Sequence, residues 1–433
     1  MRDTSKPQAG VSRVILLAWI GAAIFYFHQY LMRSAPSVML PELARGYGLS
    51  ETAVVTLVAL FYYGYAPTSL VAGVALDQFG ARRVIPLGAL LVGVGGLLFA
   101  ASPPAVAGLG RLLQGMGGVF ALLGAAYIAA RYFPASQAGT LIGATQMFGM
   151  AGGAAGQFLV GPAIAAGAPW RALWVGFGLV SLAIGAVLLV LLPKSQSSAA
   201  AEGAGGAWLR DALKALGQVF RNPQSILCGL ISGLLFLPTT VFTMVWGVRF
   251  LQEAHDIPYS FAVLRSAAVP VGWMIGCPLL GALSDRIGRR KPVILGGAAV
   301  LLVCLGLILF APAGMFPTFS LGLVAGLASG AAMLPYTVIK EANRPDHSGT
   351  ATGVVNFLNF SLSALLGPVF GVLLVRFSEG GSRELGHYQL AFQPLIGGVG
   401  LAILLTFFLR ETGRAARLAQ GGASAKPSSL ATP

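Results

Sequence analysis

The chain has 433 residues, of which 56% are hydrophobic and only 10% are charged, and its net charge is +14. A soluble domain carries about 25% charged residues, so the composition excludes an ordinary water-soluble fold and indicates a chain that lies mostly in lipid. The three cysteines all fall within hydrophobic stretches, so neither a disulfide framework nor a metal cluster is expected.

Hydrophobic stretches near or above the roughly 20 residues that cross a hydrocarbon core recur along the whole sequence. They cover residues 14–40, 53–76, 84–101, 105–130, 138–166, 172–192, 226–250, 261–283, 293–311, 316–339, 352–375 and 390–409. They are rich in Gly and Ala and lack the alternating pattern of membrane strands, which favours helices over a β-barrel. The predicted fold is therefore an all-α membrane protein with 12 transmembrane helices.

The spans divide the chain into four regions. Residues 1–192 are expected to form an N-terminal six-helix bundle, and 193–222 a cytoplasmic linker that begins rich in Ser, Ala and Gly. Apolar residues at helical spacing, with basic residues among them, predict an amphipathic helix at the end of this linker. Residues 223–413 are expected to form a C-terminal six-helix bundle, followed by a disordered cytoplasmic tail at 414–433.

The basic residues decide the expected orientation. With the N-terminus in the cytoplasm, most Lys and Arg residues fall on the inner side and few remain for the outer loops, as the positive-inside rule requires. Both termini are then cytoplasmic, and the chain is expected in the cytoplasmic (inner) membrane as a multi-pass protein. Because topology accounts for the net charge, the bilayer is the expected partner and nucleic acid is not.

An internal repeat relates the two halves. One set of small and charged residues follows the second span: Gly73, Asp77, Gly80, Arg82 and Arg83. A matching set follows the eighth span at the same spacing: Gly281, Asp285, Gly288, Arg290 and Lys291. A weaker echo at nearly the same offset pairs Arg131 with Lys340 and Gln146 with Asn356. Two echoes at one offset predict two bundles related by a pseudo-two-fold axis.

These motifs resemble those of a known family, the major facilitator superfamily. The stretch from Gly73 to Arg83 is similar to the family's signature between the second and third helices, and the copy from Gly281 to Lys291 is closer still. The run Arg111-Leu-Leu-Gln114-Gly115 resembles the fourth-helix signature. The resemblance implies a monomeric secondary transporter that works by alternating access. No nucleophile with a base, phosphate loop or metal-ligand spacing is present, so neither an enzyme nor a cofactor is expected.

The repeated motif predicts a gate at the inner ends of the helices. Asp77 and Asp285 are placed to pair with nearby cations and to face the positive N-terminal end of a helix from the opposite half, an interaction of about 0.3–1 kcal/mol. The helices that open near Ser348 and Ser136 are the expected partners. The alternative is that these turns only satisfy topology. The predicted gating residues are the ten repeated residues together with Arg111, Arg131 and Lys340.

Arg33 is the predicted substrate-binding residue. It precedes Glu42 by about 13 Å of helix rise, which places it inside a hydrocarbon core about 30 Å thick. All 14 acidic residues lie at or beyond the ends of the spans, so none is available to neutralise it there. An intramembrane arginine by default marks a functional site, although such a side chain also extends to the membrane surface in some proteins. A guanidinium without a counterion is suited to a carboxylate or phosphate.

Further binding residues are predicted by helical spacing and by polarity. Tyr26, Gln29 and Tyr30 share a helix face with Arg33. The others are polar or aromatic side chains within apolar spans, which also serve as interhelical hydrogen-bond partners: Tyr63, Tyr65, Gln114, Gln146, Trp246, Asn356 and Asn359. His28 lies off the Arg33 face and is assigned to proton coupling, although a structural imidazole explains it as well.

The predicted function is the movement of a small organic anion, a carboxylate or a sugar acid, with Arg33 holding its charge. Tyr30-Leu-Met-Arg33 is similar to the first helix of organophosphate:phosphate antiporters, but the second arginine of their seventh helix has no counterpart between Thr239 and Trp246. A singly charged carboxylate therefore fits better than a phosphate, with or without a co-transported ion. The alternatives are an exporter of hydrophobic or cationic compounds and a membrane sensor on the same fold.

Overall fold

The computed structural model describes residues 12–101, 103–133, 135–193, 207–310, 318–344 and 347–413. Twelve helices in these ranges are long and apolar enough to cross a membrane. Hydrocarbon offers no hydrogen-bond partners, and a helix pairs its backbone groups internally. The predicted all-α fold with 12 spans is confirmed. Residues 194–206 of the predicted linker and all of the predicted tail, 414–433, lie outside the described residues.

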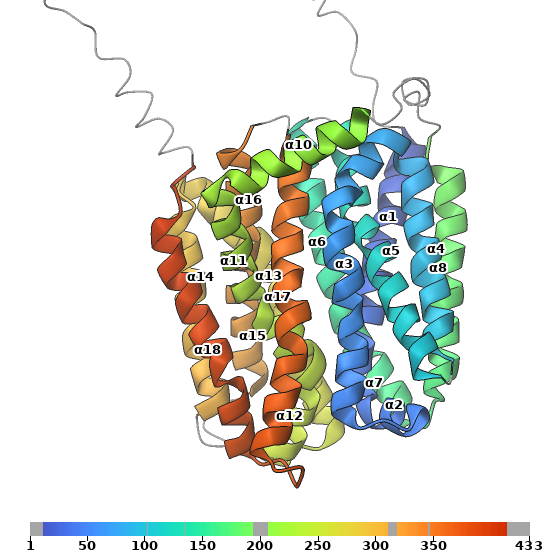
Figure 1. The fold of residues 1–433 in the computed structure, drawn as a ribbon, viewed down its shortest axis with the longest axis vertical. Helices are drawn as coiled ribbons and strands as arrows, with labels where there is room; N and C mark the ends of the chain where they lie inside the picture. Colours follow the sequence, from blue (N-terminus) through green and yellow to red (C-terminus); the bar gives the residue numbers. More distant parts are fainter. Residues whose placement is uncertain are drawn as a thin grey trace, which may run out of the picture.

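The first half contains six spans and one short connecting helix, α2 (Leu40–Tyr47). The spans are α1 (Arg13–Ser34) with the 3-10 turn η1 (Ala35–Val38), α3 (Glu51–Phe79), α4 (Ala81–Phe99), α5 (Pro104–Tyr132), α6 (Ala135–Phe158) with α7 (Val160–Ala165), and α8 (Trp170–Leu191). A further helix, α10 (Ala207–Arg221), lies across one end of the molecule (Figure 1).

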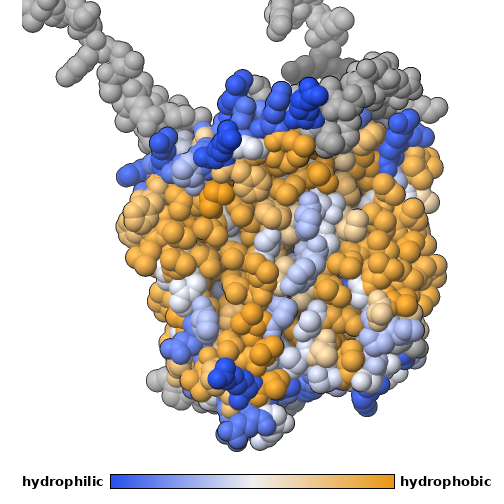
Figure 2. Space-filling view, viewed as in Figure 1, coloured by the Kyte–Doolittle hydropathy of each residue, from blue (hydrophilic) through white to orange (hydrophobic). Residues whose placement is uncertain are grey.

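The second half contains the other six spans. They are α11 (Pro223–Leu237) with η2 (Pro238–Trp246) and α12 (Gly247–His255), α13 (Tyr259–Ile287), α14 (Lys291–Phe310), α15 (Thr318–Ser329) with η3 (Gly330–Met333) and α16 (Leu334–Ala342), α17 (Ser348–Phe377), and α18 (Leu385–Phe408). Figure 1 shows the two halves side by side, with α3 and α17 adjacent where they meet. Figure 2 shows mainly apolar residues over the middle of the visible face, with hydrophilic residues gathered at its two ends.

The seventh span differs from a continuous α-helix. Its central segment, η2, is a π-helix, and it begins at Pro238, which has no N–H to donate and whose ring disturbs the preceding turn. The Thr243 hydroxyl donates to the Pro238 carbonyl at 3.2 Å. Periodicity predicts a span here but does not distinguish an α-helix from a π-helix, and π segments are frequent at functional sites.

Close packing of α3 against α5 fixes the centre of the first half. A Cβ atom at Gly115 would overlap the carbonyl oxygen of Phe61, and one at Gly64 would overlap the carbonyl oxygen of Leu112. Small residues let helix backbones approach each other in this way within a bilayer. The contact brings the α3 residues around Tyr62 close to Arg111 of α5.

We expect Gly115→Leu to destabilise the protein, because its side chain must push α3 away from α5. Overpacking of this kind costs about 1–3 kcal/mol, and thermal unfolding of the purified protein measures it as a lower melting temperature. Gly176→Leu in α8 is the matched control, since no atom outside its own helix backbone lies within 4 Å of a Cβ built there. Equal losses in the two variants would contradict the role of the contact.

Candidate functional site

Arg33 lies between the two halves of the molecule. Its side chain is only 3% exposed, so it neither faces lipid nor extends to a surface. Six aromatic ring centroids lie between 4.7 and 6.0 Å from its guanidinium carbon. The first half contributes the rings of Tyr30, Phe61, Tyr62 and Tyr65, and the second half contributes Phe236 and Phe360. Ring faces attract a cation, so the enclosure stabilises the charge without neutralising it.

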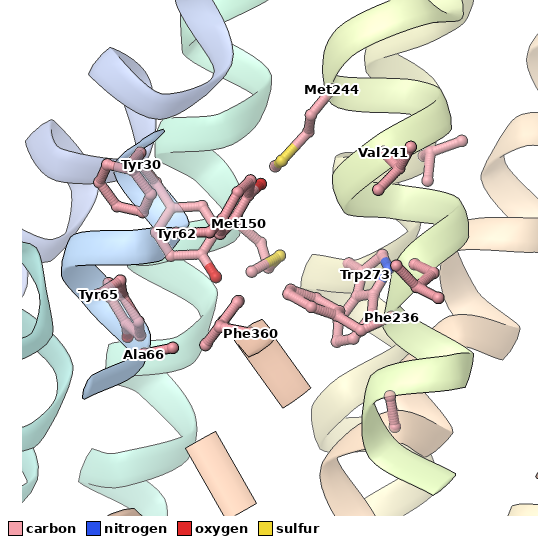
Figure 3. Close-up of a cluster of buried hydrophobic side chains, with 14 of the residues drawn as sticks. Tyr30, Tyr62, Tyr65, Ala66, Met150, Phe236, Val241, Met244, Trp273 and Phe360 are labelled. Atoms are coloured by element: carbon pink, nitrogen blue, oxygen red, sulfur yellow. The ribbon is translucent and has the colours of Figure 1, made fainter. Parts of the chain in front are cut away.

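The aromatic rings form one connected cluster across the interface. Phe360 of α17 stacks on Tyr62 at 6.0 Å and meets Tyr65 edge-on at 4.5 Å. It also meets Phe236 of α11 at 5.6 Å. Figure 3 shows Phe360 lying between the tyrosines of the first half and Phe236 of the second. Movement of one half relative to the other must therefore change the surroundings of Arg33.

Among the described residues, Arg33 has one hydrogen-bond partner, Tyr62. Its Nε and Nη2 atoms donate to the Tyr62 hydroxyl at 3.4 and 3.3 Å, and that hydroxyl donates to the Thr240 carbonyl of η2 at 3.5 Å. The Nη1 atom is buried and has no partner in the part of the chain that the structure describes. Within the described ranges, no carboxylate forms an ion pair with Arg33. The site therefore holds a full positive charge with unused donor capacity.

Arg111 lies close to Arg33, although the fourth-helix resemblance assigned it to gating. It is 1% exposed, and its guanidinium carbon is 5.2 Å from the Phe61 ring that Arg33 also approaches. Both arginines line one small cavity of about 10 Å³, together with Tyr62 and Thr240. The tertiary fold thus adds a second buried cation to the site.

A cavity of about 760 Å³ lies on the other side of the aromatic cluster, between α5 and α6 of the first half and α13 and α16 of the second. Its polar lining includes Gln146, Tyr336 and Lys340. The Tyr26 hydroxyl donates to Gln146 at 3.3 Å, and Tyr26 packs on Tyr30, whose ring lies 4.8 Å from the Arg33 guanidinium carbon. A chain of direct contacts thus connects this cavity to Arg33.

The two predicted asparagines belong to the same region. The Tyr336 hydroxyl donates to Asn356, and the Asn359 amide donates to Tyr336 at 3.2 Å. The Asn356 Nδ2 and Asn359 Oδ1 atoms are buried without partners. One donor and one acceptor are thus left unused beside Tyr336, which itself lines the large cavity.

Tyr62, rather than the predicted Tyr63, contacts Arg33. The Tyr63 side chain is 44% exposed, and one residue corresponds to a rotation of about 100° around the helix, so the two neighbours point in different directions. The sequence of α3 does not reveal which of its faces points toward Arg33, because apolar residues lie on every face of this helix.

Three other predicted binding residues lie outside the Arg33 cluster. Gln114 accepts a hydrogen bond from Arg111 at 2.7 Å. Gln29 is 1% exposed, and neither polar atom of its amide has a partner. Trp246 is fully buried, and its ring lies 5.5 Å from the guanidinium carbon of Arg383.

His28 makes a structural contact within the first half. Its Nε2 atom lies 2.8 Å from the Phe177 carbonyl oxygen of α8, and its side chain is 6% exposed. No contact in the described part of the chain connects it to Arg33. Its assignment to proton coupling stays a prediction.

The second glycine of each repeated motif, Gly80 or Gly288, follows the end of a helix. Gly80 follows α3 with φ of 75°, and Gly288 follows α13 with φ of 68°, a region that favours glycine. Gly73 faces the backbone of Gly349 at the start of α17. A Cβ atom built on Gly73 would lie 3.5 Å from the Gly349 carbonyl oxygen. These two turns mark one end of the molecule, hereafter the motif end.

The charged motif residues of the second half bind within that half. Arg290 pairs with Asp285 at 2.5 Å and with Glu341 at 3.0 Å. Burial acts to lower the pKa of Arg290, but its hydrogen bonds to Glu341 and Asp285 raise it above the ordinary value, so it stays charged. The Lys291 ammonium donates to the Phe407 carbonyl at 2.9 Å. Asp285 and Lys340 also line the large cavity, which therefore reaches the motif end.

The remaining predicted gating residues lie at the same end. Arg82 donates to the Leu192 carbonyl at 2.8 Å and so ties α4 to the end of α8. Arg83 and Arg131 are exposed, and Gly281 lines the large cavity. The side chains of Asp77 and Ser136 lie outside the described residues.

A charged cluster joins the halves at the opposite end. Glu51, at the start of α3, pairs with Arg249 of α12 and with Arg383, the latter at 3.0 Å. Glu253 lies 3.6 and 3.7 Å from the same two arginines and accepts from the Tyr388 hydroxyl at 2.5 Å. These side chains are between 17 and 22% exposed. The halves are therefore bound together at this end, hereafter the Glu51 end. At the motif end α3 and α17 stay in contact, while the large cavity separates α5 and α6 from α13 and α16.

Comparison with known proteins gives one family and several full-length relatives. The Major Facilitator Superfamily profile matches residues 22–368. "Membrane sensor protein UhpC" of Escherichia coli strain K12 is 25% identical over 93% of each chain. "Probable sulfoacetate transporter SauU" of Cupriavidus necator is 27% identical, covering 89% of this chain and 91% of the relative. "Glycerol-3-phosphate transporter" of Bacillus subtilis strain 168 is 23% identical over 96% of each.

Solved structures share the fold at low sequence identity. The xylose transporter XylE from E. coli, in a partially occluded inward open conformation, matches with a TM-score of 0.66 and 16% identity. The match covers 93% of this chain and 99% of that one.

We expect Glu51→Gln to loosen the Glu51 end, because it removes the charge that pairs with two arginines of the other half. A loss of about 1 kcal/mol of stabilisation at the Glu51 end changes the ratio of the two conformations about fivefold. The change favours the conformation in which the large cavity is closed. Cys277 lines that cavity, so its rate of labelling by a methanethiosulfonate reagent should fall in a Cys228→Ala, Cys304→Ala background.

Glu42→Gln is the matched control for this prediction. It removes an exposed pair with Arg45 within one half and should leave the labelling rate unchanged. A Glu51→Gln rate equal to or faster than that of the parent protein would show that the cluster does not hold the halves together.

Proposed function

This chain belongs to the major facilitator superfamily, and we propose that within it the protein moves a small organic anion, a carboxylate or a sugar acid, whose charge is bound by Arg33. The family makes it a multi-pass secondary transporter of a small molecule and not an enzyme. The observation that carries the proposal is the buried Arg33 guanidinium, which lies between the halves without a carboxylate and with Nη1 unpaired.

The names of two relatives support this substrate class. Sulfoacetate and glycerol 3-phosphate, which appear in the names of two full-length relatives, are both small organic anions. The site itself supports the same class, because a buried guanidinium attracts a carboxylate or phosphate and binds it with two parallel hydrogen bonds. The same charge opposes a cationic substrate, so an exporter of cationic compounds fits the site less well.

The positions of the contacts between the halves support the proposal of alternating access. The Glu51 cluster holds one end closed, while the large cavity opens between α5 and α6 of one half and α13 and α16 of the other and reaches Gln146 beside Tyr26. Arg33 lies between these two regions. In the proposed transport cycle the Glu51 end opens while the motif end closes. The positive-inside rule predicts that the motif end faces the cytoplasm.

A sensor is the second candidate, because a relative whose match covers 93% of both chains is named a membrane sensor protein. A sensor binds the same anion at the same site but does not carry it across the membrane. Uptake of a radiolabelled anion into proteoliposomes distinguishes the two, since binding without accumulation favours the sensor.

We expect Arg33→Gln to weaken anion binding by about 10- to 100-fold, because hydrogen bonds to a charged group contribute about 1.5–3 kcal/mol. Ligand-dependent stabilisation of the purified protein against heat measures this loss, with small carboxylates, sugar acids and lipophilic cations as the test compounds. Arg45→Gln, which removes an exposed arginine, should bind as the parent protein does. Stabilisation by lipophilic cations that persists in Arg33→Gln would instead favour an exporter.

A further inference from the structure

We propose that Arg111 is a second substrate-binding residue and that the preferred substrate carries two negative groups. The inference rests on the proposed function and narrows its substrate class. It reverses the expectation of a singly charged carboxylate, which followed from the absence of an arginine in the seventh span. The second arginine comes from α5 instead.

The two guanidinium groups lie around one aromatic ring. The carbon of the Arg33 guanidinium is 5.4 Å from the Phe61 centroid, and that of Arg111 is 5.2 Å away. Both residues line the same small cavity beside Tyr62. An anion with two charged groups on a short spacer therefore has a cation available for each group.

The walls of this cavity come from both halves. Val58, Tyr62 and the two arginines belong to the first half, and Thr240 and Met244 to the second. A residue that only stiffened the first half would not need to line a space at this interface. At about 10 Å³ the cavity has room for about one water molecule in this conformation. Val55, four residues after Glu51, also lines it, so separation of the halves at the Glu51 end would widen it.

Arg111 is held in position by neutral groups. Its Nε atom donates to the Val58 carbonyl at 3.3 Å, and its Nη1 atom donates to Gln114 at 2.7 Å. Gln114 is in turn fixed by donating to the Gly95 carbonyl at 2.8 Å. These partners orient the guanidinium but carry no charge, and in the described ranges no carboxylate pairs with it.

The charge balance decides the class of substrate. Two buried cations near each other repel, so each raises the free-energy cost of burying the other. Buried charges in proteins are usually paired with an opposite charge. A monoanion neutralises one arginine and leaves the other uncompensated, whereas a dianion neutralises both. The favoured ligands are thus small dicarboxylates and sulfocarboxylates.

Matched pairs of anions test the inference. Malonate, succinate and glutarate are each compared with the corresponding monoamide, which has nearly the same size but one charge fewer. Dissociation constants are measured on the purified full-length protein by heat stabilisation. We expect at least one dianion to bind about tenfold or more tightly than its monoamide, the ratio that corresponds to one charge-assisted hydrogen bond.

Arg111→Gln should reduce this ratio to below about threefold while leaving the affinity for the monoamide within about threefold of the parent value. Arg111→Lys keeps the charge and should keep a preference for the dianion. Arg33→Gln should weaken both ligands. If Arg111→Gln does not fold, the parent ratio and the ratio in Arg111→Lys decide the matter.

The outcomes separate this inference from the function it rests on. If the parent protein binds a monoamide as tightly as its dicarboxylate, or if Arg111→Gln keeps the parent ratio, Arg111 is structural and the inference is wrong, while anion transport stands. If no anion of either kind binds, the proposed function fails and the inference fails with it.

Discussion

A guanidinium buried between two moving halves, without a carboxylate beside it, is the constraint on which the rest of the site depends. Removing such a charge from water is costly, and the Arg33 surroundings offset the cost only in part. Aromatic faces attract the cation, and Tyr62 accepts two of its hydrogen bonds. One nitrogen stays unpaired. A negatively charged solute that enters between the halves completes the arrangement, which explains why an anion is the proposed cargo.

In the proposed mechanism, the position of this charge couples binding to the movement of the halves. Rings from both halves enclose Arg33, so its surroundings change when the halves move. Tight backbone contacts such as that between Gly115 and Phe61 favour movement of each half as a unit. The Glu51 cluster and the large cavity lie toward opposite ends. Closure at one end and opening at the other are then two results of the same movement.

The sequence predicts the 12-helix fold and the burial of Arg33, and the structure agrees with both. Span lengths, the basic residues and the repeat from Gly73 to Lys291 predicted 12 helices in two halves, because hydrocarbon permits few alternatives. Arg33 stood out because charges inside spans are rare. The phase of α3 could not be predicted, so Tyr63 was chosen in place of Tyr62. The closeness of Arg111 to Arg33 depends on the packing of α3 against α5, which no local pattern reveals.

The central claim is tested most directly by a structure of the protein with a bound anion. The account predicts density for the anion between the halves, within hydrogen-bond distance of Arg33 Nη1, with Arg111 near its second charged group. An anion bound instead at the motif end, beside Lys340 or Arg131, with the Arg33 guanidinium still enclosed by its six rings, would contradict the account.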